Sequence, residues 1–498
     1  MTDFDRDDTT PGTTDVTRRD FLRTGAAAGL GAAVALHGIP TAAAAAIGAP
    51  APTDPPPAGA IRVRQTAGAQ RYAELPSVAW RPVAGRAGAA DVVLRPQQRF
   101  QDVLGFGAAF TDAACYTFNR LTPAARAELF HDLFHPSQLG LSTGRACVGS
   151  SDYSTKAYSY DESDTPDPEL AKFSIEHDKQ WILPMLREAR AVNPDIFLLA
   201  SPWSPPGWMK DNNSMLGGTI RRRYLPVYAN YLTKFVQAYA AEGVRVDAVT
   251  SQNEVDTDQD GRMPQCTWPQ EIEVAFVGEH LGPSFEKAGV KTKIWLIDHN
   301  YNLWGRAIAS LEDDAVRKYA DGVAWHGYVG SPAAMTRVHD AFPQKHAYWT
   351  EGGPDITAPD YQTDWTHWTT QFAGIMRNWS RCIIAWNYAL DEQGKPNIGP
   401  FPCGGVVTIH SQTREITRSG QYWALAHFSR HVERGARVFA SSGGAKELAH
   451  VAFENPDKSR VLVLANSGKA ATTTRVVLGG HQARVTLPPD SVTTLEWA

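Results

Sequence analysis

Residues 222–254, RRYLPVYANYLTKFVQAYAAEGVRVDAVTSQNE, contain one unit of the pattern that decides the fold. Its first part carries apolar residues at helical spacing, which place one face of a helix against a core: Leu225, Tyr228, Leu232, Phe235, Val236 and Tyr239. Gly243 ends this predicted helix. A short apolar run then starts at Val246 and leads into polar residues that finish at Glu254. The unit therefore predicts a helix followed by a strand with a polar end.

The same alternation is repeated along the chain from about residue 100. Segments with helix start signals separate eight apolar runs that are typical of strands. The runs are Gln101 to Phe110, Leu141 to Val148, Ile196 to Trp203, Val246 to Glu254, Lys293 to Asn300, Gly322 to Tyr328, Ala347 to Gly353 and Cys382 to Leu390. Alternating strands and helices in this number predict an α/β fold, a (β/α)8 TIM barrel.

After about residue 432 the chain changes to short β-rich runs separated by turn residues. The runs are Leu448 to Phe453, Arg460 to Ala465, Thr473 to Leu478, Ala483 to Leu487 and Val492 to Trp497. They predict a small antiparallel β-sandwich, and strands at Ile61 to Gln65 and Val78 to Trp80 are expected to join it. We therefore assign 60–97 to the N-terminal sandwich strands, 98–431 to the barrel and 432–498 to the C-terminal sandwich.

The composition is that of a folded globular protein, with 43% hydrophobic and 20% charged residues. A net charge of -5 gives no basic surface for a nucleic-acid partner. Fifteen Trp and 16 Tyr supply rings either for a large core or for a surface on which sugars stack. The five cysteines are odd in number and lack a C-x-x-C pair, so they predict neither a zinc site nor a disulfide framework.

The N-terminus carries the pattern of a twin-arginine export signal. Arg18 and Arg19 precede an apolar run from Gly25 to Leu36, and an alanine tract follows at Ala42 to Ala46. We expect residues 1–46 to be a signal peptide, residues 47–59 to be a linker, and the protein to be secreted or periplasmic. The alternative is a membrane anchor, but the run is too short and too rich in Gly and Ala, so no stable membrane anchor is expected.

Two glutamates end predicted barrel strands. Glu254 closes the fourth run and Glu351 the seventh, so they are expected to face each other across the mouth of the barrel, where the active sites of such folds lie. Two carboxyl groups about 5 to 5.5 Å apart suit retaining glycoside hydrolysis. The alternative is a pair of ordinary surface glutamates in salt bridges. Both residues stand at the ends of apolar runs, in V-T-S-Q-N-E and Y-W-T-E-G-G, which favours the catalytic interpretation.

Two further patterns concern metals. Asp256 to Gly261 reads D-T-D-Q-D-G, like the start of a calcium loop, but the twelfth position is Thr267 instead of Glu. We interpret this segment, Asp256 to Asp260 above all, as a solvated acidic loop and leave calcium as the alternative. Asp298, His299 and His326 lack metal-ligand spacing, and we expect them to form a hydrogen-bond network around the glutamates. We predict neither a metal nor a cofactor.

Several spaced motifs between about residues 98 and 435 resemble glycoside hydrolase family 30, the glucosylceramidase-like retaining β-glycosidases. They are Q-D-V-L-G-F-G from Gln101, T-D-A-A from Thr111, S-P-W-S-P-P-G-W-M-K from Ser201, Q-N-E from Gln252, D-H-N from Asp298 and T-E-G from Thr350. The resemblance implies a barrel with a β-sandwich side domain formed by both termini. One departure is Val255, where the family often has Pro, and it leaves the substrate class open.

Carried over by position, the resemblance implies that Glu254 is the acid/base and Glu351 the nucleophile. It also implies that Asn253 contacts the 2-hydroxyl of the sugar, and that Asp112, Trp203 and Trp386 line the subsite for the non-reducing sugar. His326 and Tyr328 end a barrel strand and are expected beside them. The candidate substrate-binding residues are therefore Asp112, Trp203, Asn253, His326, Tyr328 and Trp386.

We predict a secreted retaining β-glycosidase that hydrolyses β-glucosidic bonds as a β-glucosidase or glucosylceramidase, with a carbohydrate or glycoside as its partner. An endo-β-1,6-glucanase and a xylan-active hydrolase of the same family are the alternatives within enzymes. From another class, a non-catalytic carbohydrate-binding protein would keep the aromatic residues and lose one glutamate. The sequence leaves the sugar, the aglycone, exo or endo action and the oligomeric state open.

Overall fold

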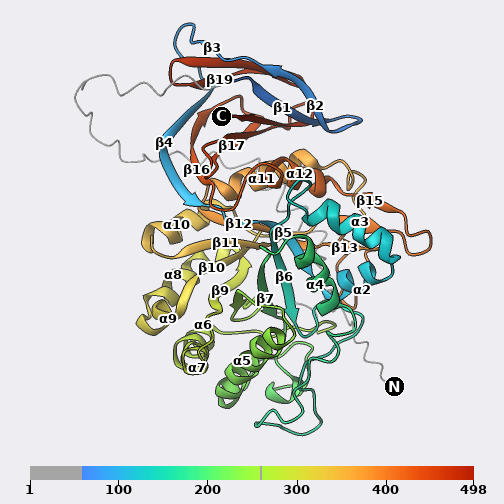
Figure 1. The fold of residues 1–498 in the computed structure, drawn as a ribbon. Helices are drawn as coiled ribbons and strands as arrows, with labels where there is room; N and C mark the ends of the chain where they lie inside the picture. Colours follow the sequence, from blue (N-terminus) through green and yellow to red (C-terminus); the bar gives the residue numbers. More distant parts are fainter. Residues whose placement is uncertain (1–58, 258–260) are drawn as a thin grey trace, which may run out of the picture.

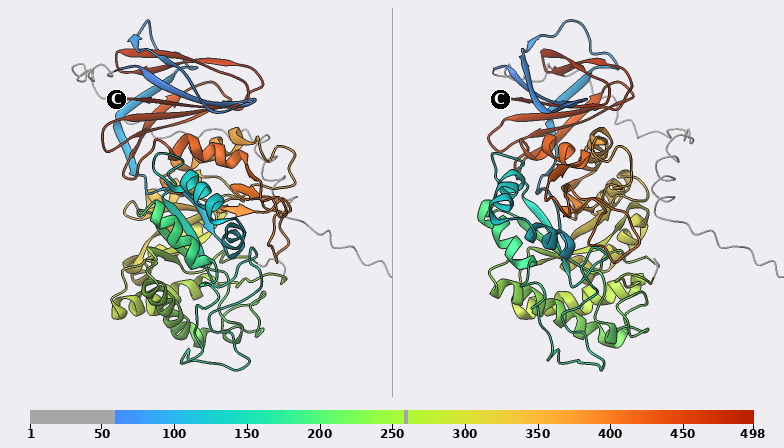
Figure 2. Two further views of the ribbon diagram at one scale, coloured as in Figure 1. Left: turned by 45° about the vertical axis from the view of Figure 1, so that its right-hand side comes forward. Right: turned by 90° about the vertical axis from the view of Figure 1, so that its right-hand side faces the viewer.

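The computed structural model of the protein describes residues 59–257 and 261–498. The expected signal peptide and all of the expected linker except Gly59 lie outside the described residues, as do residues 258–260 of the acidic loop. The described chain forms a barrel with a β-rich body stacked on it (Figure 1). Both views in Figure 2 show these two layers, with the C-terminus in the β-rich body.

Eight parallel strands close into a barrel, as predicted. In chain order they are β5 Gly105–Phe110, β6 Thr143–Val148, β7 Phe197–Pro202, β8 Ala248–Thr250, β9 Lys293–Asn300, β10 Ala320–His326, β11 His346–Glu351 and β12 Ser380–Asn387. Neighbours in the chain are neighbours in the barrel, and β12 pairs with β5 to close it. Almost every strand residue is buried, because the strands face side chains inside the barrel and helices outside it.

Helices follow the strands and cover the outside of the barrel (Figure 1). The described α-helices are α2 Asp112–Asn119, α3 Pro123–Phe134, α4 Ile182–Val192, α5 Leu225–Ala241, α6 Gln270–Ala275, α7 Gly282–Ala288, α8 Trp304–Glu312, α9 Asp314–Tyr319, α10 Ala333–Ala341, α11 Trp365–Met376 and α12 Gly420–Ser429. In α5 the apolar face predicted from the sequence is buried. Thr122 accepts a hydrogen bond from the backbone N–H of Ala125 and caps α3.

The β-rich body is one ten-stranded sheet built from both ends of the described chain. Its strands are β1 Ile61–Ala67, β2 Gln70–Val78, β3 Arg81–Pro82, β4 Val92–Asp102, β16 Arg437–Gly443, β17 Leu448–Glu454, β18 Arg460–Asn466, β19 Thr472–Leu478, β20 His481–Leu487 and β21 Ser491–Trp497. The sheet joins the two ends because β1 pairs with β21, and β4 lies between β16 and β19.

The fold differs from the sequence prediction at several strands. The strand expected at Val78 to Trp80, for example, is only the end of β2, which stops at Val78. The run Gln101 to Phe110 is two strands, because β4 ends at Asp102 and β5 begins at Gly105, whose φ of +148° favours glycine. A three-stranded sheet in the connection from β12 to α12 was also not predicted: β13 Ala389–Leu390, β14 Val407–Ile409 and β15 Ile416–Arg418. Strands of two or three residues are too short to give a sequence signal.

The sandwich and the barrel meet at α11 and α12 (Figure 1). His427 of α12 is fully buried there, and its ring nitrogens are hydrogen bonded to the hydroxyls of Thr66, at 2.9 Å, and Thr494, at 2.8 Å. One histidine thus joins the barrel to strands from both ends of the chain. All five cysteines are buried thiols. No helix in the described ranges is long and apolar enough to span a membrane.

Candidate active site

The two predicted catalytic glutamates lie at the carboxyl end of the barrel and close to one histidine. Glu351 is the last residue of β11, and Glu254 follows the end of β8. His326, the last residue of β10, places Nδ1 3.2 Å from Glu254 Oε1 and Nε2 3.9 Å from Glu351 Oε2. Both glutamates are at most 5% exposed. The structure therefore brings together the pair that the sequence placed three strand and helix units apart.

Arg145 of β6 connects one glutamate to the rest of the site. Its Nη1 donates to Glu351 Oε2 at 2.5 Å, and its Nη2 donates to Asn253 Oδ1 at 2.7 Å and Asp298 Oδ2 at 2.8 Å. Burial acts to lower the pKa of Arg145, but the carboxylates of Asp298 and Glu351 outweigh it and raise that pKa above its ordinary value. Arg145 is a permanent buried cation between carboxylates.

The sequence analysis missed Arg145. Its signal was a charged residue inside the apolar run Leu141 to Val148. A buried arginine needs a carboxylate partner, and strand ends elsewhere in the chain offered several. The sequence does not show which carboxylate it meets, because the partners Asp298 and Glu351 are more than 150 residues away.

Asp298 of β9 accepts most of the hydrogen bonds that connect the residues around the two glutamates. Its Oδ1 lies 3.1 Å from His326 Nε2 and accepts from Thr350 Oγ1 at 2.7 Å. Its Oδ2 accepts from Arg145 and from the hydroxyls of Ser201 and Thr250. Burial acts to raise the pKa of Asp298, but Arg145 and His326 hold it well below its usual range. Asp298 is therefore ionised and orients both cations.

His326 is charged at neutral pH in this environment. Burial acts to lower its pKa, but the charges of Glu351 and Asp298 and the hydrogen bonds with Asp298 and Glu254 outweigh that effect and raise the pKa to about 9. Glu254, His299 and His326 also place one ligand atom each within 4.8 Å of one another, a group with metal-binding potential. We assign these residues to a hydrogen-bond network, because His326 already directs Nδ1 to Glu254 and Nε2 to Asp298.

The backbone that carries the site is strained. Glu254, Ile297 and Asp298 have φ values of 50°, 71° and 46°, which residues with side chains rarely adopt. The Glu254 N–H donates to the Asp298 carbonyl at 2.9 Å, and the Ile297 N–H donates to Glu273 Oε1 at 2.8 Å. Buried Glu273 is itself fixed by Arg306. Such strain is typical of functional sites, and here it turns Glu254 toward His326.

Asn253 and Tyr328 are both connected to Glu351, Tyr328 directly and Asn253 through Arg145, and their predicted contacts with a sugar remain predictions. The Tyr328 hydroxyl donates to Glu351 Oε1 at 3.0 Å, while Arg145 donates to the other oxygen of the same carboxylate. Because the Asn253 carbonyl oxygen accepts from Arg145, its side-chain amide is held in one orientation. Glu351 is thus fixed at both oxygens.

Trp203 and Trp386 form one wall beside Arg145. Their rings stack with centroids 5.2 Å apart, and the Arg145 guanidinium lies 4.7 Å and 5.4 Å from the two centroids. The rings pack on each other, so a sugar has no room between them. Tyr153 packs against Trp386 edge to face. That the wall contacts a sugar remains a prediction.

Asp112 lies in a different group of polar side chains. Its Oδ1 lies 2.8 Å from His177 Nε2 and accepts from Trp181 Nε1 at 2.7 Å, and its Oδ2 accepts from the backbone N–H and hydroxyl of Thr155. Asp112 is 1% exposed. These contacts bind Asp112 to the connection between β6 and α4. Its predicted contact with the sugar remains a prediction.

Comparison with known proteins places this geometry in a family. The glycosyl hydrolase family 30 TIM-barrel domain matches residues 103–432, and the family 30 beta sandwich domain matches residues 435–495. An endo-1,6-beta-D-glucanase of Neurospora crassa is 33% identical over 390 residues, which cover 74% of this chain and 80% of that protein. The lysosomal acid glucosylceramidase of Mus musculus is 29% identical over 75% of this chain and 77% of its own. A solved endo-beta1,6-glucanase aligns with a TM-score of 0.79 at 30% identity, over 88% of this chain and all of its own.

Proposed function

Because the chain belongs to glycosyl hydrolase family 30 and is a glycoside hydrolase that acts on carbohydrates, we propose that it cleaves β-1,6-linked glucan internally, with retention of configuration. The observation that carries the retaining mechanism is the pair Glu254 and Glu351, buried at the carboxyl end of the barrel on either nitrogen of His326. Two carboxyl groups that flank one bond are the requirement of this reaction.

In the proposed mechanism Glu351 is the nucleophile. Arg145 and Tyr328 donate to its two oxygens, which suits a carboxylate that must be ionised to attack. Its oxygen forms a bond to the anomeric carbon as the bond to the leaving oxygen breaks, and Glu254 gives its proton to that oxygen. Glu254 then takes a proton from water, whose oxygen attacks the anomeric carbon and releases Glu351.

The proposed substrate rests on the relatives. Similarity to the Neurospora crassa protein and to the solved endo-beta1,6-glucanase favours β-1,6-glucan over the glucosylceramide-like substrate that the sequence analysis placed first. A glucosylceramide is the second candidate, because the mouse glucosylceramidase covers a similar share of the chain. Xylan is less favoured, since the solved family 30 xylanases of Talaromyces cellulolyticus and Clostridium acetobutylicum are 20% and 17% identical and show the fold alone.

A substrate panel tests this choice. The purified protein is incubated with linear β-1,6-glucan, β-1,4-linked xylan and a short-chain glucosylceramide, and the products are separated by size. We expect mixed oligosaccharides from β-1,6-glucan at early times. Release of glucose alone, or faster cleavage of either other substrate, would contradict the proposed internal cleavage of β-1,6-glucan.

Azide rescue tests the roles of the two glutamates. Glu351→Ala should abolish turnover, and azide should restore it by entering from the vacated side to give the α-glycosyl azide. Glu254→Ala should retain activity on an aryl glucoside with a good leaving group, and azide should then give the β-glycosyl azide. The reverse pattern would exchange the two roles.

We further propose that the protein is exported by the twin-arginine pathway, on the basis of Arg18 and Arg19 and the alanine tract that follows. Replacement of both arginines by lysine should keep the precursor in the cytoplasm. Fractionation and immunoblotting of the two forms provide the measurement, and unimpaired export of the Lys-Lys variant would refute the proposal.

A further inference from the structure

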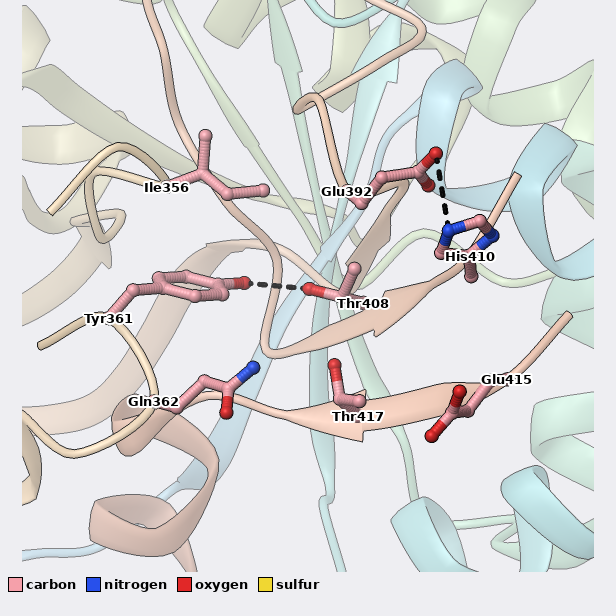
Figure 3. Close-up of a pocket in the computed structure, with 8 residues that line it drawn as sticks. All are labelled: Ile356, Tyr361, Gln362, Glu392, Thr408, His410, Glu415 and Thr417. Carbon is pink, nitrogen blue, oxygen red and sulfur yellow. Dashed lines mark hydrogen bonds and ion pairs between the residues drawn. The ribbon is translucent and has the colours of Figure 1, made fainter. Parts of the chain in front are cut away.

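A cavity opens in the connections that leave the carboxyl ends of β11 and β12 (Figure 3). Its volume is about 300 Å³. One wall comes from residues 352–364, which follow Glu351, and the other from the three-stranded sheet β13, β14 and β15, which follows Trp386. The cavity is therefore built on the same end of the barrel as the catalytic pair.

The two connections are joined by hydrogen bonds, so the cavity is formed in advance. The Ile356 N–H donates to the Pro402 carbonyl at 3.0 Å, and the Gly404 N–H donates to the Pro354 carbonyl at 2.8 Å. The Tyr361 hydroxyl crosses between the connections and donates to the Gly405 carbonyl at 2.7 Å. A preformed pocket saves the ordering cost that a mobile loop would add to binding.

The same connection also reaches the wall beside the catalytic glutamates. The Tyr153 hydroxyl donates to the Phe401 carbonyl and accepts from the Cys403 N–H, both at 2.7 Å, and the Tyr153 ring packs on Trp386. Ile356 is five residues beyond Glu351, so their Cα atoms are at most about 18 Å apart. An extended chain of a few sugar units spans such a distance.

The lining is mostly polar and contains no lysine or arginine, and its one basic side chain is His410. Glu392 and Glu415 supply carboxylates, and Thr408 and Thr417 supply hydroxyls, as Figure 3 shows. His410 Nδ1 accepts from the N–H groups of Gln412 and Thr413, so its Nε2 is left as a donor near Glu392. Fixed acceptors beside fixed donors match the hydroxyl groups of a sugar.

Other ligand classes fit this lining less well. An anion would be repelled by the two carboxylates. That of Glu392 stays charged, because hydrogen bonds from the backbone and side chain of Ser411 outweigh the effect of burial and lower its pKa to about 2. Among the described residues, the groups close enough to share a metal ion do not include Glu392, His410 and Glu415. Ile356 and the Tyr361 ring give only a small apolar surface, enough for one face of a pyranose.

We propose that this cavity, lined by Glu392, Glu415, Thr408 and Thr417, is an accessory subsite that binds one glucosyl unit of the glucan at a distance from the bond that is cut. The proposal rests on the proposed function. The subsite adds binding energy only for long substrates, because a monosaccharide glycoside that fills the cleavage site does not reach the cavity. It would hold a polymer in the orientation required for internal cleavage.

Two variants test the subsite. Glu415→Ala removes an acceptor, and Thr417→Phe fills the cavity with a side chain that suits a strand. Gln412→Ala is the matched control, since Gln412 is an exposed neighbour on the same turn that does not line the cavity. The measured quantity is kcat/KM for long β-1,6-glucan divided by kcat/KM for an aryl β-glucoside.

We expect this ratio to fall about tenfold in Glu415→Ala, which loses one charge-assisted hydrogen bond to the sugar, and about tenfold or more in Thr417→Phe, whose ring occupies the space of the glucosyl unit. The ratio should stay within twofold of the unmutated enzyme in Gln412→Ala. An equal ratio in all four proteins would overturn the subsite while the proposed function stands. Absence of β-1,6-glucan cleavage by the unmutated enzyme would overturn the proposed function and this assignment with it.

Discussion

Arg145 is the residue on which the charge balance of the site depends. It is fully buried and pairs with Asp298 and Glu351. Arg145→Met should lower the free energy of unfolding by about 3 to 5 kcal/mol, because two carboxylates stay buried without their cation. The double variant Arg145→Met, Asp298→Asn should lose less unfolding free energy than the two single variants lose together, by about 0.5 to 3 kcal/mol. Urea unfolding curves provide these values.

The control for this cycle is Arg126→Met. Arg126 pairs with Glu188 near the surface, and the Glu188 side chain is 42% exposed. Its loss should cost about 1 kcal/mol or less. If Arg145→Met were no more harmful than Arg126→Met, the central role given to Arg145 would be wrong.

His326 makes the stability of the protein depend on pH in a defined range. Its pKa rises from 6.5 to about 9 on folding, so its contribution is complete below pH 6.5 and is lost as the pH rises through 9. The difference in unfolding free energy between the unmutated protein and His326→Gln should therefore shrink by about 3 kcal/mol from pH 6 to pH 10. A difference that stays constant over this range would show that His326 is not charged in the folded protein.

Among the secondary-structure elements, the contact between β5 and β6 depends on glycine. A Cβ at Gly107 would lie 1.8 Å from the backbone oxygen of Thr143, and no side-chain rotation relieves that overlap. Gly107→Ala should destabilise the protein by about 3 kcal/mol or more. The matched control is Gly305→Ala in α8, where an added Cβ meets nothing within 4 Å and a gain of about 0.4 to 1 kcal/mol is expected. Equal melting temperatures for the two variants would contradict this packing.

The strands show how far the sequence predicts the fold. The run Lys293 to Asn300 was predicted with the bounds of β9, because its apolar residues are continuous. The run Val246 to Glu254 was predicted too long: only Ala248–Thr250 pair as β8, and the residues after them leave the strand until Glu254 turns with positive φ. Tertiary contacts with Asp298 set that turn, and local sequence patterns do not record them.

The candidate site was predicted to a similar degree. Glu254 and Glu351 were found because a charged residue after a buried strand has few structural explanations. Arg145 lies inside its strand instead of at the end, so the same criterion passed over it. The sheet β13 to β15 and its cavity were missed because their strands pair across a connection without a periodic pattern.

At the scale of the whole molecule, the sandwich and the barrel are packed together through α12. β1 and β21 come from opposite ends of the described chain and pair along their length, and His427 joins them to α12 through Thr66 and Thr494. Burial lowers the pKa of His427 to about 3, so the ring is neutral in this contact. The barrel presents the glutamates at its carboxyl end, while the sandwich packs on α11 and α12 (Figure 1).

The stereochemistry of the first product tests the central claim most directly. Retention through Glu351 requires that each cleavage of a β-linked glucan releases a new reducing end in the β configuration. Proton NMR of linear β-1,6-glucan, recorded within the first minutes after enzyme is added, should show the β-anomeric signal before mutarotation produces the α form. Initial appearance of the α anomer would contradict the retaining mechanism and the nucleophile role of Glu351.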